Sequence, residues 1–318
     1  MTSQIRVDWT SCPRPPFCRF RSVPNLRVLP WSARKAVGAL FCVFALLAGA
    51  AMPAEAKLAL AFGAYSSDKP SAMVAQLRPS LDVIAREMSA ILGEPVAITM
   101  QVVRSYEAGV DLVVSGKVDF ARLGAASYIT AINQNPSLEI LAMENKRGSK
   151  TFRGVICVRR DSDITALGQL EGRSFAFGNT RSTLGRYLAQ LTLFRSGISA
   201  QDLARYEYLG RHDKVGRAVG SGLFDAGAVE ETVFAKLVKQ GVPIRAIATY
   251  ATATKPWVAR QGLAARVKLA LRQALLGLSD RSALQALRFD GFLAGDDSDF
   301  GATRQAIKEN PRFFAPGQ

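Results

Sequence analysis

The segment best suited to chemistry is residues 178–185, Gly-Asn-Thr-Arg-Ser-Thr-Leu-Gly. It follows an apolar run that predicts a strand and leads into an amphipathic run over 182–196 that predicts a helix. Ser182 or Thr183 can cap this helix, so that the free N–H groups of its first turn and two hydroxyls point to one place. Gly185 leaves room for a close approach. The segment therefore suits an anion the size of phosphate, and the alternative is a plain capped helix after a strand-to-helix loop.

His212 is the only histidine, and it follows a short predicted strand at the start of a helical run. An imidazole at the end of a strand can donate a hydrogen bond to an oxyanion, and a solvated loop histidine is the alternative. A single histidine excludes the two-histidine and three-histidine zinc motifs. Cys157 lies in the apolar run 154–158 and is interpreted as a buried strand thiol. We therefore expect neither a metal site nor a cofactor.

Ser182 and His212 could also form a nucleophile and its base in a secreted hydrolase. Against this, the sequence has no G-x-S-x-G elbow, and spacing identifies no third group to orient the histidine. It also has no Walker A motif and no G-x-G-x-x-G motif. Glu230 and Glu231 are adjacent, so their side chains point in different directions on a helix. One of them could still face a cleft, and we expect no catalytic residue.

Three tyrosines lie where predicted elements meet one edge of a sheet. Tyr65 follows the first predicted strand, Tyr106 begins a helix after the second, and Tyr128 lies in the helix after the third. Each phenol could donate a hydrogen bond to an anion at that edge, or could belong to the ordinary core.

Positioning these side chains requires two α/β lobes. Short apolar runs alternate with helical runs over residues 57–143, and again over 154–250, with a polar connection over 144–150. Such alternation implies mostly parallel sheets with helices on their faces. Beyond Pro256 the sequence predicts largely helix. Two lobes of this kind leave a cleft, and pockets form at domain interfaces and at the carboxyl ends of parallel strands.

The N-terminal 56 residues are interpreted as a signal peptide with an extended start. An apolar run over 36–51 follows Arg34 and Lys35, and Ala54-Glu55-Ala56 supplies a cleavage site. We expect cleavage after Ala56 and export to the periplasm, with an uncleaved membrane anchor as the alternative.

The chain is strongly basic, with 41 Lys and Arg against 26 Asp and Glu, a formal net charge of +15. This balance favours anionic partners. The basic residues are scattered, and no nucleic-acid motif is present, so nucleic acid is not expected as a partner. Apolar residues make up 48% of the chain, which excludes wholesale disorder.

These motifs taken together resemble the phosphate, phosphite and phosphonate substrate-binding proteins of ABC importers. The resemblance covers about residues 58–250, and the order and spacing of the motifs agree throughout. Its segments are 105–107, 116–124 leading to Tyr128, 159–164 with 167–172, 182–185, 212–213 and 225–228.

The resemblance implies a type II periplasmic binding fold, with two lobes joined by two crossovers and a ligand gripped between them. It assigns residues 57–150 and 251–318 to the first lobe and 151–250 to the second. It also implies that Ser182, Thr183, Tyr106 and His212 bind the oxyanion. Glu230 is the nearest match to an acidic residue that binds the amine of an aminoalkylphosphonate.

The chain departs from the family pattern at three positions. Leu184 replaces a serine, Phe152 replaces a tyrosine, and Ala125 replaces a proline. The first two changes each remove a hydroxyl, worth roughly 0.5–1.5 kcal/mol as a hydrogen bond. They put the usual phosphonate affinity in doubt. Arg181 is a candidate to supply charge instead.

We therefore expect a monomeric, non-enzymatic periplasmic protein that captures a small oxyanion and delivers it to an inner-membrane ABC importer. Three alternatives remain open at this point. The protein could present its ligand to a membrane-bound kinase as a sensor, bind a sulfonate or organic acid instead, or be the secreted hydrolase considered above.

Overall fold

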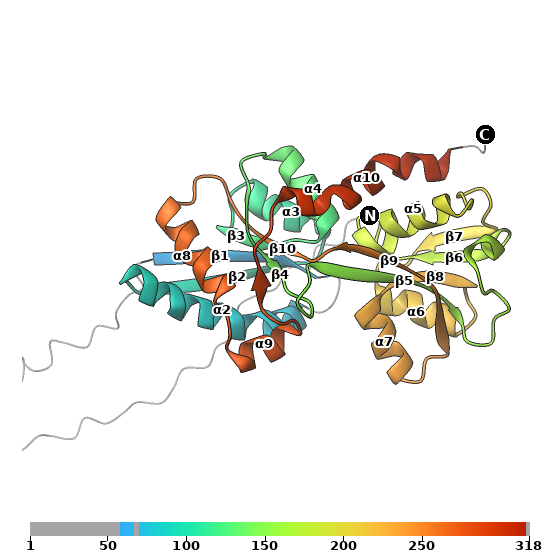
Figure 1. Cartoon of the computed structure of the whole chain (residues 1–318), viewed down its shortest axis with the longest axis horizontal. Helices are drawn as coiled ribbons and strands as arrows, with labels where there is room; N and C mark the ends of the chain where they lie inside the picture. The colour runs from blue at the N-terminus through green and yellow to red at the C-terminus, as the bar shows by residue number, and fades with distance from the viewer. Residues whose placement is uncertain (1–57, 67–69, 316–318) are drawn as a thin grey trace, which may run out of the picture. The chain divides into compact units, whose positions relative to one another are not determined.

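Two mixed β-sheets organise residues 58–66 and 70–315, which the computed structural model describes (Figure 1). The first sheet has the strand order β11-β4-β10-β3-β1-β2. Its strands are β1 (Leu58–Tyr65), β2 (Val96–Val103), β3 (Phe120–Arg122), β4 (Glu139–Glu144), β10 (Pro256–Ala259) and β11 (Phe292–Leu293). Strands β2 and β3 pair parallel with β1, whereas β10 runs antiparallel between β3 and β4.

The second sheet has the strand order β7-β6-β8-β5-β9. Its strands are β5 (Thr151–Arg159), β6 (Ser174–Phe177), β7 (Arg205–Tyr208), β8 (Ala226–Glu230) and β9 (Ile244–Ala253). Strand β6 pairs parallel with β7 and β8, and β5 runs antiparallel to both β8 and β9. The sheets are therefore mixed, and the expectation of mostly parallel sheets was wrong because the strands at the two crossovers return against the direction of their neighbours.

Helices cover both faces of the first sheet. One face carries α2 (Pro70–Leu92), α8 (Ala265–Leu276) and α9 (Arg281–Leu287), which share an apolar core with Leu60 and Phe62 of β1. The other face carries α3 (Tyr106–Val114) and α4 (Ala125–Gln134), which form a separate core. Alternate residues of β1 enter the two cores, as the two-residue repeat of a strand requires.

The second sheet is covered in the same way. The short 3₁₀ helix η1 (Leu167–Leu170) and α5 (Leu188–Arg195) pack on one face, and α6 (His212–Gly220) and α7 (Glu231–Lys239) pack on the other. Cys157 of β5 is fully buried in the second of these cores, and burial raises the pKa of its thiol to about 12. This confirms its interpretation as a buried strand thiol.

Two strand connections cross between the sheets, β4 to β5 over residues 145–150 and β9 to β10 over Thr254 and Lys255. The C-terminal part crosses once more. Helix α10 (Gly301–Glu309) contacts both α4 and α5, and the following turn η4 (Asn310–Phe314) places Phe313 in the core of the second sheet (Figure 1). The family resemblance assigns residues 251–318 to the first lobe, and within this range Phe313 packs on the second sheet.

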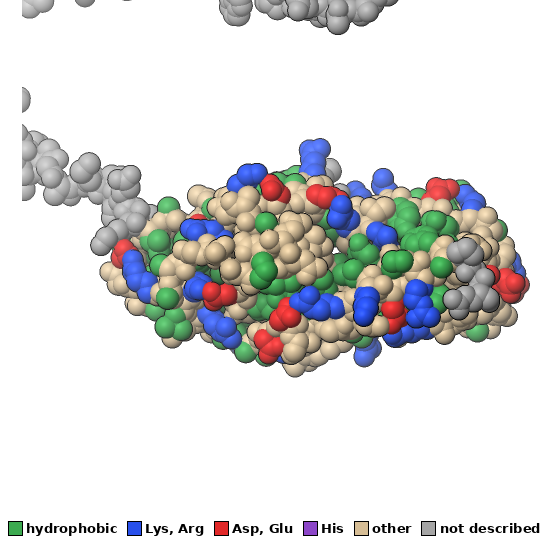
Figure 2. Space-filling model, turned by 90° about the horizontal axis from the view of Figure 1, so that it is seen from above, with side chains coloured by type: hydrophobic (Ala, Val, Ile, Leu, Met, Phe, Trp, Pro, Cys, Tyr) green, Lys and Arg blue, Asp and Glu red, His purple; other side chains and the backbone are tan. Residues whose placement is uncertain are grey.

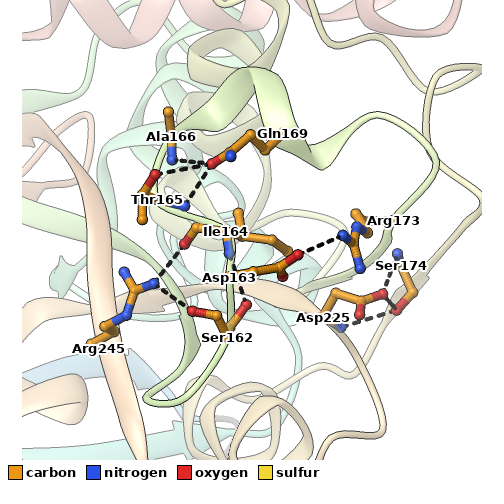
Figure 3. Close-up of polar contacts among 10 residues, drawn as sticks. All are labelled: Ser162, Asp163, Ile164, Thr165, Ala166, Gln169, Arg173, Ser174, Asp225 and Arg245. Carbon is orange, nitrogen blue, oxygen red and sulfur yellow. Dashed lines mark hydrogen bonds and ion pairs between the residues drawn. The ribbon is translucent and has the colours of Figure 1, made fainter.

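A network of polar contacts fixes the loop between β5 and β6, where the family resemblance was dense. The Arg245 guanidinium donates to the Ser162 and Ile164 carbonyls at 3.0 and 2.7 Å, and Ser174 and Asp225 bond to each other (Figure 3). These residues hold the second lobe together, so this part of the resemblance concerns the fold rather than the ligand.

Basic and acidic side chains are interspersed on the face shown in Figure 2, with no basic block on it. Within the described residues, no helix has the length and apolarity needed to cross a membrane. The predicted signal peptide and its cleavage after Ala56 lie outside the described residues.

Candidate anion-binding site

The segment singled out in the sequence forms a tight turn at the end of β6. Ser182 caps the helix, and its Oγ accepts a hydrogen bond from the Gly185 amide at 2.9 Å. The first helical turn, η2 (Thr183–Tyr187), is a π-helix, because the Tyr187 amide donates to the Ser182 carbonyl at 3.2 Å. Single π turns are frequent at functional sites. The amides of Thr183 and Leu184 precede the first intrahelical bond and are therefore available to a ligand.

Two glycines allow this helix to begin against the strand end. The Gly178 amide donates to the Gly185 carbonyl at 2.8 Å. A Cβ added to Gly185 would lie 2.9 Å from the Gly178 Cα and 3.1 Å from the His212 Cε1. The space left by the missing side chain of Gly185 is therefore taken up by the Gly178 backbone and by the imidazole of His212.

Thr183 reaches across to the first lobe. Its Oγ1 accepts a hydrogen bond of 2.9 Å from the amide of Ala126, the second residue of α4. The N-termini of α4 and of the helix that begins at Thr183 therefore meet at this hydroxyl. Each N-terminus carries partial positive charge, so both favour an anion placed between them.

Tyr106 and Tyr65 line the first-lobe side of this junction. The centroids of their rings lie 4.5 Å apart, and the Ser182 side chain lies beside the Tyr106 hydroxyl and opposes the rise in its pKa. The Tyr65 hydroxyl accepts a hydrogen bond from the Gly124 amide at 2.9 Å. It also forms a hydrogen bond of 3.0 Å with the Ser127 hydroxyl, in which either group can donate. Burial raises the pKa of both phenols, so both stay protonated at neutral pH. Tyr65 positions the start of α4, and Tyr106 contacts the capping serine directly.

His212 is the first residue of α6, and its ring lies against Gly178 and Gly185. Its Nδ1 is buried without a hydrogen-bond partner among the described residues, and the ring lies beside the Ala228 backbone. Burial lowers the pKa of His212, and the charge of Glu230 opposes this effect. In the neutral ring one nitrogen donates a hydrogen bond and the other accepts one, and both donate when the ring is protonated.

Glu230 ends β8 and precedes α7. Its carboxylate accepts a hydrogen bond from the Thr232 hydroxyl. Burial would raise the pKa of Glu230, but the positive charge of Lys255, followed by that of His212, holds it below its usual value. Glu231 is exposed on the first turn of α7 and lies outside this group of buried charges.

Lys255 is a site residue that the sequence analysis missed. It lies in the crossover between β9 and β10, and its ammonium lies 5.0 Å from the centroid of the Phe152 ring. Burial and the charge of Arg122 lower the pKa of Lys255, whereas Glu230 opposes that change. The only sequence signal was a lysine directly before a proline at the second crossover.

Tyr128 is not brought to the junction. It is buried in the core beneath α4, and its hydroxyl donates to Asp297 Oδ1 at 2.8 Å. The prediction that it faces the same sheet edge overlooked this bond, because Asp297 lies 169 residues further along the chain.

The Leu184 and Phe152 departures pack into one small apolar cluster. Leu184 is buried with Leu188 and Leu191, and Phe152 packs against the same cluster.

Arg181 forms an ion pair with Glu107 of α3, so its guanidinium is already neutralised. A pocket of about 140 Å³ opens beside this pair, lined by both lobes, with Tyr106, Ser127 and Tyr187 in its wall.

A family model for the periplasmic substrate-binding proteins of phosphonate ABC transporters matches residues 62–300, about three quarters of the chain. The chain belongs to this family. The probable ABC transporter phosphite-binding protein PhnD1 of Prochlorococcus marinus is 28% identical over 130 residues. That alignment covers 38% of this chain and 43% of PhnD1, less than half of the relative's length.

Solved structures share the fold of this family member over most of its length. XAC2383 of Xanthomonas citri bound to chloride has a TM-score of 0.66 at 25% identity, covering 80% of this chain and 98% of that one. PhnD1 in complex with methylphosphonate has a TM-score of 0.66 at 21% identity, covering 79% and 97%. The aliphatic sulphonate-binding protein SsuA of Escherichia coli has a TM-score of 0.55 at 17% identity, covering 80% and 88%. The type II periplasmic binding fold is therefore confirmed, and the last two likenesses concern the fold alone.

Proposed function

We propose that this protein is a periplasmic solute-binding protein that captures a small tetrahedral phosphorus oxyanion between its two lobes. The observation that carries the proposal is the Ala126–Thr183 hydrogen bond, which joins the N-termini of two helices from different lobes. Membership of the phosphonate-binding family supports the ligand class. The same membership supports an inner-membrane ABC permease as the partner that receives the ligand.

The contacts between the lobes support a closing motion about the two crossovers. Thr183 is hydrogen-bonded to Ala126, Arg181 forms an ion pair with Glu107, and Ser182 lies beside Tyr106, so each pair brings the second lobe against the first. In this proposal the oxyanion enters among these groups and adds its own hydrogen bonds to both helix N-termini. Ligand binding then stabilises the closed arrangement by hinge closure.

A binding role fits the hydroxyl of Ser182 better than hydrolysis does. Its Oγ accepts a hydrogen bond from the Gly185 amide, so it serves as a helix cap. The buried His212 Nδ1 has no serine partner among the described residues, whereas a nucleophile needs a base within hydrogen-bond reach. Release of phenolate from an aryl phosphate ester by purified protein, abolished in Ser182→Ala, would contradict this proposal.

A panel of oxyanions tests the ligand class on the chain that begins at Lys57. Phosphate, phosphite and methylphosphonate are compared with methanesulfonate and sulfate at matched ionic strength. At about 100 times its dissociation constant a ligand adds roughly 2.7 kcal/mol of stability, which for a chain of this size raises Tm by about 5–10 °C. We expect such a shift with at least one phosphorus oxyanion. A shift with sulfonates alone, or with no oxyanion, would refute the proposed ligand class.

Thr183→Val is expected to weaken binding of the tightest oxyanion in that panel about 10-fold to 100-fold. The change removes the hydroxyl that joins the two helix N-termini but keeps the shape of the side chain, and hydrogen bonds to charged groups are worth about 1.5–3 kcal/mol. Titration calorimetry measures the affinity. Thr180→Val, an exposed threonine in the same loop, is the matched control and should bind like wild type. Equal affinities for the two variants would exclude a role for the Thr183 hydroxyl.

A further inference from the structure

Lys255 places an ammonium group between the two lobes at a crossover. Its backbone carbonyl accepts from the Glu144 amide of the first sheet at 3.1 Å, and its side chain faces the charges of Arg122 and Glu144 on that side. On the other side, Glu230 at the end of β8 pairs in register with Gly154 of β5, two residues beyond Phe152, and its negative charge raises the pKa of Lys255. Among the described residues no carboxylate lies within ion-pair distance of this ammonium.

Phe152 holds this ammonium in place. The Lys255 Nζ lies 5.0 Å from the centre of the Phe152 ring, a cation–π contact. Phe152 in turn packs on the apolar cluster that contains Leu184, the second residue of the helix that Ser182 caps. The two positions that lost a hydroxyl relative to the family pattern therefore connect the lysine to the start of the helix.

The carboxylates around the junction are already balanced by cations of the chain. Among the described residues four of them form ion pairs, Glu107 with Arg181, Asp111 with Lys117, Glu144 with Arg122 and Asp213 with Arg211, and the positive charge of Lys255 lowers the pKa of the fifth, Glu230. Two of these acids, Glu107 and Asp111, line the pocket beside Tyr106. A ligand ammonium would therefore find no unbalanced carboxylate, and at Glu230 it would meet Lys255.

We propose that Lys255 makes the cleft selective for oxyanions that carry no ammonium group, so that it disfavours zwitterionic aminoalkylphosphonates. This inference rests on the proposed function, because it concerns which phosphorus oxyanions the same site accepts. The protein itself supplies the positive charge opposite Glu230, so a second positive charge on the ligand is repelled in a partly buried setting. An alkyl substituent of the same size meets no such repulsion.

An isosteric pair of ligands tests this selectivity, because ethylphosphonate and aminomethylphosphonate differ by a methyl in place of an ammonium. Calorimetry on the wild type is expected to show at least about 10-fold tighter binding of ethylphosphonate. In Lys255→Met, which keeps the length and apolar contact of the side chain, Glu230 loses its counter-charge. The preference is then expected to shift about 10-fold or more toward aminomethylphosphonate.

Two further variants make the outcome specific. Lys255→Arg keeps the charge and should keep the wild-type preference, and Lys239→Met removes an exposed lysine at the C-terminal end of α7 and should also leave it unchanged. Equal or tighter binding of aminomethylphosphonate by the wild type would overturn the inference without any variant. An unchanged preference in Lys255→Met would overturn it too, while phosphonate binding itself, and with it the proposed function, would stand. If no phosphorus oxyanion binds the wild type, both fall.

Discussion

Gly185→Ala is expected to reduce the affinity for the tightest oxyanion of the panel by about 10-fold to 100-fold. A Cβ at this position would lie 2.9 Å from the Gly178 Cα, 3.0 Å from the Ser182 Oγ and 3.1 Å from the His212 Cε1. The first of these atoms is backbone, which cannot rotate away. Overpacking of this kind typically costs about 1–3 kcal/mol, and each 1.4 kcal/mol of lost binding is a factor of ten.

We expect Gly185→Ala to reduce the affinity for the oxyanion more than the stability of the protein, because the clash lies within the candidate site. To relieve it, the start of the helix must move away from β6, which shifts the amides of Thr183 and Leu184. The same movement displaces the Ser182 hydroxyl, which bonds to the Gly185 amide at 2.9 Å. Three groups that are proposed to hold the oxyanion would change position together.

Calorimetry with the panel ligands and a thermal melt in their absence separate binding from stability. Gly301→Ala is the control, because a Cβ there meets no atom within 4 Å and alanine favours the helix α10 that begins at this residue. We expect Gly301→Ala to bind like wild type. If Gly185→Ala binds within threefold of wild type, the oxyanion is not held at this helix start.

The turn at 178–185 was predictable from the sequence because its signals are local. A capping serine, two glycines and an adjacent amphipathic run all lie within one short segment, and local hydrogen bonds determine its shape. His212 was predictable for a similar reason, as it directly follows a strand and begins a helix.

Lys255 and strand β10 were not predictable in this way because their partners are distant in sequence. Strand β10 has only four residues and pairs with β3 and β4, more than 110 residues earlier. Its apolar run Pro256–Ala259 is too short to show a period. Lys255 acquires its role only when β10 returns to the first sheet and brings Phe152, Arg122 and Glu230 around one ammonium. The hydrogen bond between Tyr128 and Asp297 was not predictable for the same reason, because the two residues are far apart in the sequence.

Arg122→Met is expected to lower the free energy of unfolding by about 3–5 kcal/mol, the cost of breaking a buried ion pair by removing one partner. The Arg122 and Glu144 side chains are each 9% exposed, and their second hydrogen bond, from Nη2 to Oε2, measures 3.2 Å. The variant leaves the Glu144 carboxylate buried beside Trp257, whose indole Nε1 donates to it only at 3.4 Å. Urea unfolding measures the change, and Tm should fall by about 10 °C.

A double variant distinguishes an unpaired charge from lost packing. Arg122→Met combined with Glu144→Met removes both charges, and replacing a whole buried pair by apolar residues is often nearly neutral. The double variant should therefore be more stable than Arg122→Met alone. Lys117→Met, which breaks the exposed pair with Asp111, should change stability by less than about 1 kcal/mol.

The same variants test whether Lys255 and the Arg122–Glu144 pair affect each other's contribution to stability. Arg122 is the largest electrostatic influence on Lys255 after burial and disfavours its ammonium, whereas Glu144 favours it. In Arg122→Met, Lys255 remains as a counter-charge for Glu144, which should recover part of the lost stability. Lys255→Met in the Arg122→Met background should then destabilise the protein by more than Lys255→Met does alone. Additive effects would show that Lys255 and the Arg122–Glu144 pair act independently, and a loss below about 1 kcal/mol for Arg122→Met would show that the pair is not buried in solution.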